Sequence, residues 1–340
     1  MISQKIRLGI VGTGRIAQAH LSAIQEKAEL TELVAVCDSD RSKAEKSASI
    51  YGAHTIYTDY RELARDPEID AVIICLPHHL HHSAAVSLVR GGKHVLVEKP
   101  MAMSVREADD MIAVAEKEGV TLMVGQSRRY TRAIALVRKK LIEISPLFRI
   151  DISFLVNFPS PKTDWWADPK KAGPLVIPLQ GSHSIDTILW LFGEIPCTVY
   201  ARSTLFNRAF KSADEADIVM GFPDGKIASV QLSLNTNPYV HETLLAGGKG
   251  TIRIYEQPTE RIYGFRNRVL FNGETIFDDE ELPTPYTNQL VEFITSLQEK
   301  REPLTSGRHV RATMQVLEAA CRSSTLGRPI NLKGNGNKNE

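Results

Sequence analysis

The segment Ile6–Ala17, which reads IRLGIVGTGRIA, is the part of this 340-residue sequence that decides its fold. It joins a short apolar run, Ile6–Val11, to the G-x-G-x-x-A pattern of Gly12–Ala17. In such a pattern the first glycine permits a tight turn, the second lets a pyrophosphate approach the backbone, and the small last residue keeps the helix close to the sheet. The segment therefore predicts a strand, a phosphate-binding turn and a helix whose N-terminus faces a dinucleotide.

The rest of the first 125 residues alternates apolar runs with amphipathic stretches. The runs are Leu33–Cys37, Ala71–Leu76, His94–Val97 and Thr121–Val124, and the stretches are Ala17–Glu26, Ser42–Tyr51, Ser83–Arg90 and Glu107–Glu118. Strands that alternate with helices predict a parallel sheet. The runs lack strict polar alternation, as expected of strands that helices cover on both faces.

An acidic residue, Asp38, directly follows the second run. Its carboxylate can bind both ribose hydroxyls of an adenosine, and it repels a 2′-phosphate. We therefore predict NAD as the cofactor, with NADP left open because Arg41 lies close by. The predicted contacts of the turn and of this acid are Gly12, Thr13, Gly14, Arg15, Ile16 and Asp38.

A different pattern begins after about residue 145, where consecutive strands are separated by the turn signals Pro223–Gly225 and Gly247–Gly250. The predicted strands are Ile150–Phe158, Cys197–Leu205, Ala216–Phe222, Lys226–Leu234, Glu242–Ala246 and Thr251–Tyr255, and the predicted helices are Pro178–Phe192, Thr287–Lys300 and His309–Thr325. We expect an α/β protein with a Rossmann domain at 1–125, whose final helix bridges to about 145. A second α/β domain with an antiparallel sheet follows at 126–332, and a polar tail at 333–340.

The composition excludes several classes of protein. Lys and Arg number 41 against 40 Asp and Glu, so no basic excess favours nucleic-acid binding. No apolar run approaches the roughly 20 residues of a membrane span, and the N-terminal residues do not resemble a signal peptide. We therefore expect a cytoplasmic protein that binds neither nucleic acid nor membranes.

Two groups of residues are of types that bind metals, but neither group has the spacing or the partners of a metal site. Cys37, Cys75, Cys197 and Cys321 form no CxxC pair, so we expect reduced thiols rather than a zinc site or disulfides. The histidines at positions 78, 79, 81 and 82 lack a nearby cysteine or acidic partner that would complete a ligand set.

Three further motifs identify a family. They are Leu76–His81 (LPHHLH), Glu98–Pro100 (EKP) and Gly181–Asp186 (GSHSID), the last preceded by Asp164–Trp166. Together with the glycine pattern, they resemble the glucose–fructose oxidoreductase / inositol dehydrogenase (Gfo/Idh/MocA) family over about residues 5–330. The Glu-Lys-Pro tripeptide is the most specific of them.

The resemblance implies a second domain with a large open, mainly antiparallel sheet, through which a dimer or tetramer assembles. It implies substrates among sugars, polyols and their derivatives. Lys99 and His183 match the catalytic lysine and histidine of the family. The residues that match its nicotinamide side are Leu76, Pro77, His81, Glu98 and Lys99.

The position of Lys99 also suits catalysis on physical grounds. Ligands of open α/β sheets bind beyond the carboxyl ends of the strands, where Glu98–Pro100 lies. Oxidation of an alcohol releases a hydroxyl proton, and a positioned base typically contributes 10²–10⁴-fold. Partial desolvation lowers the pKa of a lysine, which favours that role.

The substrate residues are less determined by the sequence. The candidates are Arg128, Tyr130, Trp165, Trp166, His183 and Asp186, with Asn157, Asn235 and Tyr239 as further polar positions. A histidine on an amphipathic helix is often structural, but Asp186 lies three residues after His183 and shares its face. The two tryptophans either line a sugar site or pack on the sheet.

One position departs from the family pattern. The family usually has an aspartate four residues before the histidine, where this sequence has Leu179. Gln180 is the nearest polar residue, but one step along an α-helix turns about 100°, so we expect it to face elsewhere. Lys99 and His183 then suffice, or Asp164 or Asp168 reaches in from the preceding loop.

These features favour an NAD(P)-dependent oxidoreductase that acts on a secondary hydroxyl of a sugar or polyol. Two other hypotheses stay open. One is a lyase or glycosidase that recycles NAD through transient oxidation and elimination, and the other is a non-catalytic NAD-binding protein. Leu179 is the main support for the second hypothesis, and the missing carboxylate also leaves the first one open.

Overall fold

The computed structural model describes residues 5–332, so the predicted polar tail at 333–340 lies outside the described residues. The chain forms two compact units. The first runs to Tyr130 and adds Pro283–Arg311, and the second comprises Thr131–Leu282 and the chain from Ala312. This division differs from the predicted boundary, because a late helix, α9 (Pro285–Glu299), belongs to the first unit.

The first unit contains a six-stranded parallel sheet in the order β3-β2-β1-β4-β5-β6. Its strands are β1 (Ile6–Val11), β2 (Thr31–Cys37), β3 (Thr55–Tyr57), β4 (Ala71–Ile74), β5 (His94–Glu98) and β6 (Leu122–Gly125). The order reverses at β1 and β4, as in doubly wound nucleotide-binding folds. The predicted Rossmann domain is confirmed. The sequence missed β3, because this half-buried edge strand of three residues forms no apolar run.

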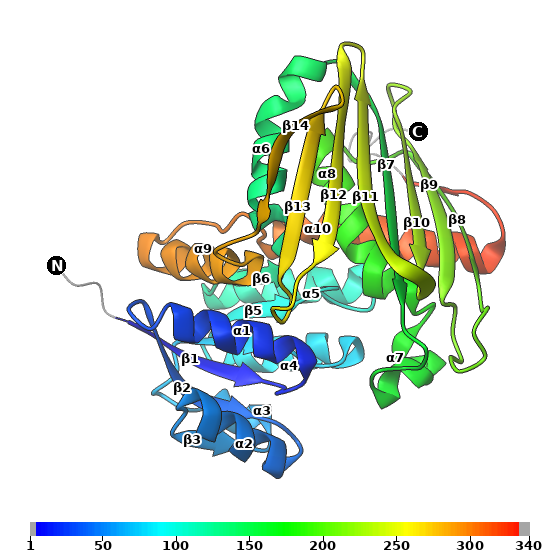
Figure 1. The fold of residues 1–340 in the computed structure, drawn as a ribbon. Coiled ribbons are helices and arrows are strands. Elements are labelled where there is room, and N and C mark those ends of the chain that lie inside the picture. Colours follow the sequence, from blue (N-terminus) through cyan, green and yellow to red (C-terminus); the bar gives the residue numbers. More distant parts are fainter. Residues whose placement is uncertain (1–4, 333–340) are drawn as a thin grey trace. The chain divides into compact units, whose positions relative to one another are not determined.

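The helices of the first unit follow the predicted stretches closely, except that the four-residue helix α3 was not predicted. They are α1 (Arg15–Glu26), α2 (Arg41–Tyr51), α3 (Tyr60–Leu63), α4 (His81–Arg90), α5 (Val105–Glu118) and α9, with short 3₁₀ turns at His78–Leu80 and Ser127–Tyr130. Helix α9 packs against α1 (Figure 1). The hydroxyl of Thr287 donates to Glu26 at 2.7 Å, which ties the two helices together.

The second unit contains a nine-stranded sheet in the order β14-β13-β12-β11-β7-β10-β9-β8-β15. Its strands are β7 (Leu147–Asn157), β8 (Thr198–Thr204), β9 (Glu215–Gly221), β10 (Ile227–Ser233), β11 (Asn235–Gly247), β12 (Gly250–Pro258), β13 (Phe265–Phe271), β14 (Glu274–Glu280) and β15 (Ile330–Asn331). Only the pairing of β7 with β10 is parallel, so the predicted, mainly antiparallel sheet is confirmed. The sequence missed β13 and β14, which carry polar side chains along much of their length.

Helices cover one face of this sheet. They are α8 (Ser182–Phe192), which lies against β7 and β10, and α10 (Gly307–Leu326) from Ala312 onward (Figure 1). Shorter elements of this unit are α6 (Arg132–Lys140), α7 (Pro169–Ala172) and the turns at Leu141–Ile144 and Asp164–Ala167. The opposite face carries half-exposed apolar side chains, including Tyr200, Val219 and Ile227.

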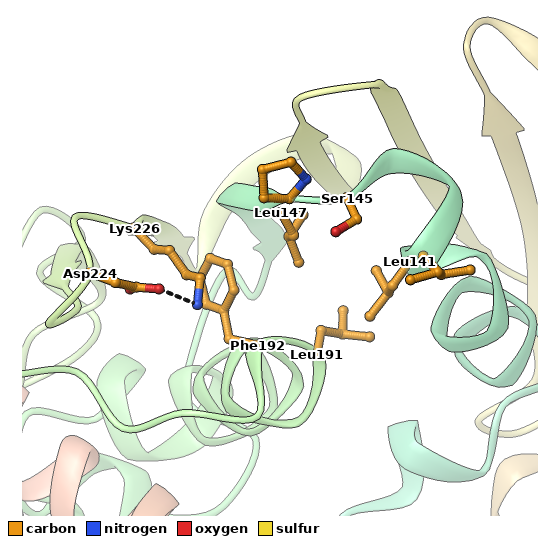
Figure 2. Close-up of a pocket in the computed structure, with 9 residues that line it drawn as sticks. Leu141, Ser145, Leu147, Leu191, Phe192, Asp224 and Lys226 are labelled. Carbon is orange, nitrogen blue, oxygen red and sulfur yellow. Dashed lines mark ion pairs between the residues drawn. The ribbon is translucent and has the colours of Figure 1, made fainter.

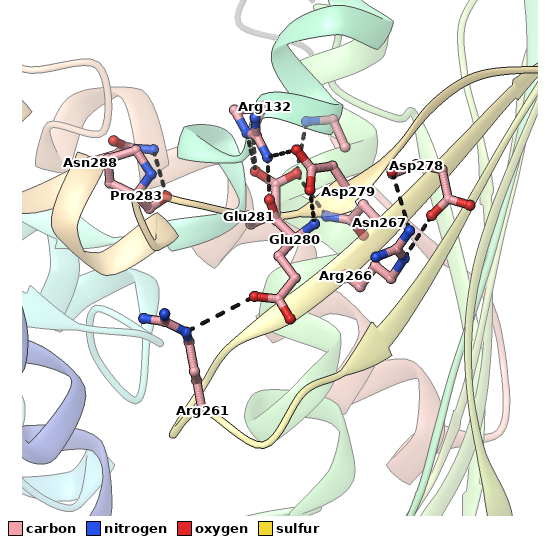
Figure 3. A network of polar contacts seen from close by, with 11 residues as sticks. Arg132, Arg261, Arg266, Asn267, Asp278, Asp279, Glu280, Glu281, Pro283 and Asn288 are labelled. Carbon is pink, nitrogen blue, oxygen red and sulfur yellow. Dashed lines mark hydrogen bonds and ion pairs between the residues drawn. The ribbon is translucent and has the colours of Figure 1, made fainter.

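A buried carboxylate fixes the start of α6. Glu281 is 1% exposed and accepts hydrogen bonds from the backbone N–H groups of Arg132 (2.7 Å) and Ala133 (2.9 Å). It also accepts one from the side-chain amide of Asn267 on β13, at 2.9 Å (Figure 3). Because the first N–H groups of a helix lack partners within the helix, a carboxylate at this place stabilises it.

We predict that Glu281→Ala lowers the free energy of unfolding by about 2–3 kcal/mol, since two buried donors and one partly buried donor lose their acceptor. Urea denaturation measures this change. The control is Asp279→Ala, which removes an exposed partner of Arg132 (3.0 Å) and is expected to change stability little. Equal losses in both variants would contradict the structural role of Glu281.

Candidate active site

The glycine turn after β1 has the geometry that a pyrophosphate requires. Gly12 has φ +84°, and a Cβ there would lie 2.5 Å from the carbonyl oxygen of Cys75, so only glycine fits. A Cβ on Gly14 would meet no atom within 4 Å, so the space in front of the turn is open. Helix α1 begins at Arg15 with no side-chain cap and no acidic residue in its first turn. The residues present therefore fit an anionic group at this N-terminus.

Asp38 is held firmly beside this turn. Its Oδ2 accepts hydrogen bonds from the backbone N–H of Thr13 (2.9 Å) and from the Thr13 hydroxyl (2.8 Å), and its Oδ1 accepts one from the N–H of Asp40 (3.0 Å). A carboxylate oxygen can accept two hydrogen bonds, so Oδ1 retains capacity for a ribose hydroxyl. The exposed Arg41 pairs with Glu45 at 2.9 Å.

His81 bridges the ends of two strands. This buried imidazole places Nδ1 2.8 Å from the carbonyl oxygen of Pro100 and Nε2 2.8 Å from that of Leu76. It thereby links the chain after β4 to the Glu-Lys-Pro motif after β5. Burial lowers the pKa of His81, although the two carbonyls favour its charged form. The sequence predicted His81 on the nicotinamide side but did not indicate this bridge.

A buried hydrogen bond holds the end of β5. His20 Nε2 on α1 lies 2.8 Å from Glu98 Oε1, and both side chains are almost fully buried. The other oxygen, Oε2, accepts a hydrogen bond from the N–H of Lys99 at 3.1 Å. Burial alone would raise the pKa of Glu98, but the hydrogen bond and the charge of His20, with the charge of Lys99, outweigh it and lower that pKa. His20 was not among the predicted site residues, although a polar residue on the buried side of the first helix was a signal.

Lys99 is the candidate base. Its side chain is partly buried directly after β5, and its peptide bond to Pro100 is cis. Burial lowers the pKa of Lys99 to about 8; the carboxylate of Glu98 opposes this shift, and the guanidinium of Arg128 adds to it. An amine with such a pKa can take up and release a proton near neutral pH.

Three other predicted residues of the first unit, Leu76, Pro77 and Tyr130, lie in segments that follow β4 and β6. Leu76 and Pro77 are half-buried after β4. The hydroxyl of Tyr130 lies 3.0 Å from that of Thr305, and its carbonyl accepts a hydrogen bond from Asn288 on α9 at 3.1 Å. Tyr130 is therefore tied to the late segment of this unit.

His183 belongs to the second unit, as the second residue of α8. A π-helical turn, Ile177–Gly181, directly precedes α8, and such turns are frequent at functional sites. Leu179 and His183 are both half-exposed, consistent with a shared side of the helix. Asp186 is 1% exposed and accepts a hydrogen bond from the hydroxyl of Thr313 on α10 at 2.9 Å. The structure thus gives Asp186 a helix–helix contact, and its contact with substrate stays a prediction.

The aromatic and acidic residues before α8 have different surroundings. Trp166 is buried between Phe158 and Trp165, with ring centroids 5.4 and 6.1 Å away, so it packs within the unit. Trp165 is half-buried. Asp164 is exposed, whereas Asp168 accepts a hydrogen bond from the N–H of Lys170 at 3.0 Å and caps α7.

A pocket of about 390 Å³ lies elsewhere in the second unit (Figure 2). Its lining includes Leu141, Leu147 and Phe192, and the ammonium of Lys226 at its rim pairs with Asp224 at 2.7 Å. None of the predicted site residues lines it. This pocket is therefore distinct from the candidate site residues.

Within residues 5–332, no three His, Cys, Asp or Glu side chains are placed to hold a metal ion. His82 instead pairs with Asp110 at 2.7 Å. The helices of this part of the chain all lack the length or the hydropathy that a bilayer-spanning segment requires.

Two family models match this chain. Residues 6–126 match the model described as "Oxidoreductase family, NAD-binding Rossmann fold", and residues 138–253 match the GFO/IDH/MocA C-terminal domain. The inositol 2-dehydrogenase of Rhizobium meliloti is 28% identical over 339 residues, covering 96% of this chain and 99% of that protein. The D-apiose dehydrogenase of Paraburkholderia graminis is 25% identical over 343 residues, covering 97% of this chain and 90% of that protein.

A solved structure shares the whole architecture. The aldose–aldose oxidoreductase of Caulobacter crescentus, complexed with glycerol, is 26% identical with a TM-score of 0.85, covering 97% of this chain and 100% of that one. The fold and the family match together define an NAD-binding oxidoreductase. The chain belongs to the Gfo/Idh/MocA family.

We predict that Asp38→Ala raises the Kd for NAD⁺ roughly ten- to a hundredfold, because charge-assisted hydrogen bonds to the ribose are lost. The Kd for NADP⁺ should rise less or fall, since the repulsion of the 2′-phosphate is also removed. Isothermal titration calorimetry measures both constants. The control Asp40→Ala changes the carboxylate that caps α2 and should leave both unchanged. An equal effect on the two cofactors would contradict the assignment of Asp38.

Proposed function

We propose that this protein transfers a hydride between NAD and a secondary hydroxyl of a sugar or polyol, with Lys99 as the acid–base group. The observation that carries the proposal is the partly buried Lys99 at the end of β5, in the same unit as the glycine turn and Asp38. The names of the relatives, which include dehydrogenases of inositol and D-apiose, support this substrate class.

Different residues of the first unit would bind the cofactor and transfer the proton. The turn of Gly12–Gly14 and the N-terminus of α1 would hold the pyrophosphate, and Asp38 would hold the ribose. NAD, when bound, supplies the hydride acceptor for alcohol oxidation. The neutral amine of Lys99 takes the hydroxyl proton, so that the substrate carbon loses a hydride and its oxygen a proton, leaving a carbonyl. Glu98, held by His20, fixes the backbone N–H of Lys99.

We assign to His183 a second role in proton transfer or substrate binding. Its half-exposed side chain on the first turn of α8 and its match to the family histidine support this assignment.

An absorbance assay for reduced nicotinamide tests the proposal. Purified protein is mixed with NAD⁺, and in parallel with NADP⁺, across myo-inositol, D-glucose, D-xylose and glucose 6-phosphate. We expect turnover with at least one compound. If the protein binds NAD⁺ and oxidises none of a broad polyol panel, the proposed function is wrong, and cofactor retained through purification would favour the NAD-recycling reaction instead.

In the same assay, we expect the rate of oxidation to rise as pH increases through about 8 and then to level off. The reason is that the pKa of Lys99 is lowered to about 8, and only the neutral amine accepts a proton. Lys99→Met should lower kcat by roughly 10²–10⁴-fold and abolish this pH step. The control is Lys117→Met, which changes an exposed lysine on α5. A pH step that survives in Lys99→Met would contradict the role of Lys99.

We also propose that the open face of the nine-stranded sheet forms the contact between subunits. Tyr200 on β8 pairs in register with Val219 on β9, and both are partly exposed apolar residues. Val219→Asp should therefore shift the protein to a smaller species in size-exclusion chromatography with light scattering. Lys211→Asp, which alters an exposed loop, is the control. An unchanged mass for Val219→Asp would argue against this interface.

A further inference from the structure

The open face of the nine-stranded sheet carries exposed charges near both of its edges. Arg202 on β8 is in register with Asp217 on β9, and Arg268 on β13 is in register with Asp278 on β14. All four side chains are exposed. Buried and exposed residues alternate along β9 and β13, so these charges point away from the helices that cover the other face.

These four residues lie at one level of the sheet. Register pairs connect Asp217 to Arg268 through one residue from each intervening strand, namely Gln231, Ser153, Glu242 and Tyr255. Neighbouring strands are about 4.8 Å apart, so about 24 Å separates the backbone at Asp217 from that at Arg268. This distance exceeds the Debye length of about 8 Å at physiological salt, so the two charges do not attract each other within one chain.

The two charges are also available to an outside partner. Within residues 5–332, neither Asp217 nor Arg268 forms an ion pair, and the guanidinium of Arg268 lies 5.1 Å from the centre of the Tyr255 ring. Two residues along each strand, the exposed Arg266 and the half-buried Glu215 repeat the signs of their neighbours. Strand β9 is therefore acidic on this face, and strand β13 is basic.

An apolar level runs beside the charged one. Tyr200 on β8 and Val219 on β9 are in register, and register pairs across the sheet place the half-buried Leu270 on β13 at the same level. Strands β9 and β13 thus both combine an apolar side chain with charges, and their charges have opposite signs. Surfaces of this composition are typical of contacts between proteins.

The size of this face suits a second copy of the chain. Its eight longer strands, about 4.8 Å apart and each with about seven residues at about 3.3 Å, present roughly 800 Å². A stable interface buries about 800 Å² on each partner. Two copies that meet through this face therefore reach the size of a stable interface.

The charge pattern distinguishes two ways of pairing the copies about a twofold axis. An axis along the strands, between β7 and β11, reverses the strand order in the second copy. Strand β9 then lies opposite β13 of the second copy and β8 opposite β14, so Asp217 meets a basic side chain and Arg202 an acidic one. An axis across the strands places each strand opposite itself, so like charges meet and oppose association.

We propose that two copies of this chain pair through the open face with the twofold axis along the strands, so that Asp217 of one copy contacts Arg268 of the other. The apolar level of Val219 then meets that of Leu270 across the interface. This inference rests on the subunit contact proposed above, to which it adds the orientation of the copies and a specific ion pair.

The test exchanges the two charges between separate chains. In Asp217→Arg and in Arg268→Asp, each dimer contains two pairs of like charges, so we expect the Kd of self-association to rise about tenfold or more. In an equal mixture of the two variants, a mixed dimer has opposite charges at both contacts, and the Kd should return to within about threefold of the original. Sedimentation velocity over a dilution series measures these constants. Each variant keeps its own intrachain contacts in the mixture, so the recovery reports the contact between copies alone.

A matched control and a folding control accompany this test. Lys211→Asp reverses an exposed charge in the loop between β8 and β9 and should leave the Kd of self-association unchanged. The Kd for NAD⁺ should stay the same in every variant, because the glycine turn belongs to the other unit.

The outcomes separate this inference from the proposals on which it builds. Single variants that associate like the unaltered protein, or a mixture that associates no more tightly than its components, overturn the orientation while the subunit contact stands. An unaltered protein that is monomeric over the whole dilution series overturns both. The nicotinamide assay tests hydride transfer separately, so neither result decides the proposed reaction.

Discussion

The buried pair of His20 and Glu98 is the interaction on which the candidate site of the first unit depends. A carboxylate taken out of water is costly unless it is paired, and His20 from α1 provides that partner at 2.8 Å. The second oxygen of Glu98 then holds the backbone N–H of Lys99. The same charge opposes the full neutralisation of Lys99, so the lysine has a pKa of about 8 rather than a lower one. One buried carboxylate therefore holds the backbone of the proposed base and limits how far burial lowers its pKa.

His81 bridges the segments that follow β4 and β5, next to the same buried carboxylate. Its ring contacts the carbonyls of Leu76 and Pro100, so the chain after β4 and the chain after β5 are held together. Rossmann units bind ligands at this edge because the parallel strands all end there with loops that are free to vary. In this protein two histidines, one from α1 and one from α4, contact the end of β5 and the segments that follow β4 and β5.

The strands that could be predicted from the sequence differ in burial from those that could not. Strands β1, β2, β4, β5 and β6 of the first sheet are buried, and their apolar runs made them visible. Strands β3, β13 and β14 lie at or near sheet edges with polar or half-exposed residues, so no hydrophobic pattern marked them. The assignment of α9 to the first unit also escaped prediction, because contacts such as Thr287 with Glu26 join residues far apart in the chain.

The sequence by itself determined the nucleotide-binding half of this protein. Gly12, Gly14 and Asp38 act through local backbone conformation and through strand ends that the parallel topology brings together, and the Glu-Lys-Pro motif marked Lys99. Only the tertiary structure decided what surrounds them. The partner of Glu98 lies 78 residues away, and a π-turn before α8 interrupts the α-helical periodicity that the sequence predicted there. Hydrogen bonds and burial depend on atoms that only packing brings within reach, and a linear pattern of residue types does not encode those distances directly.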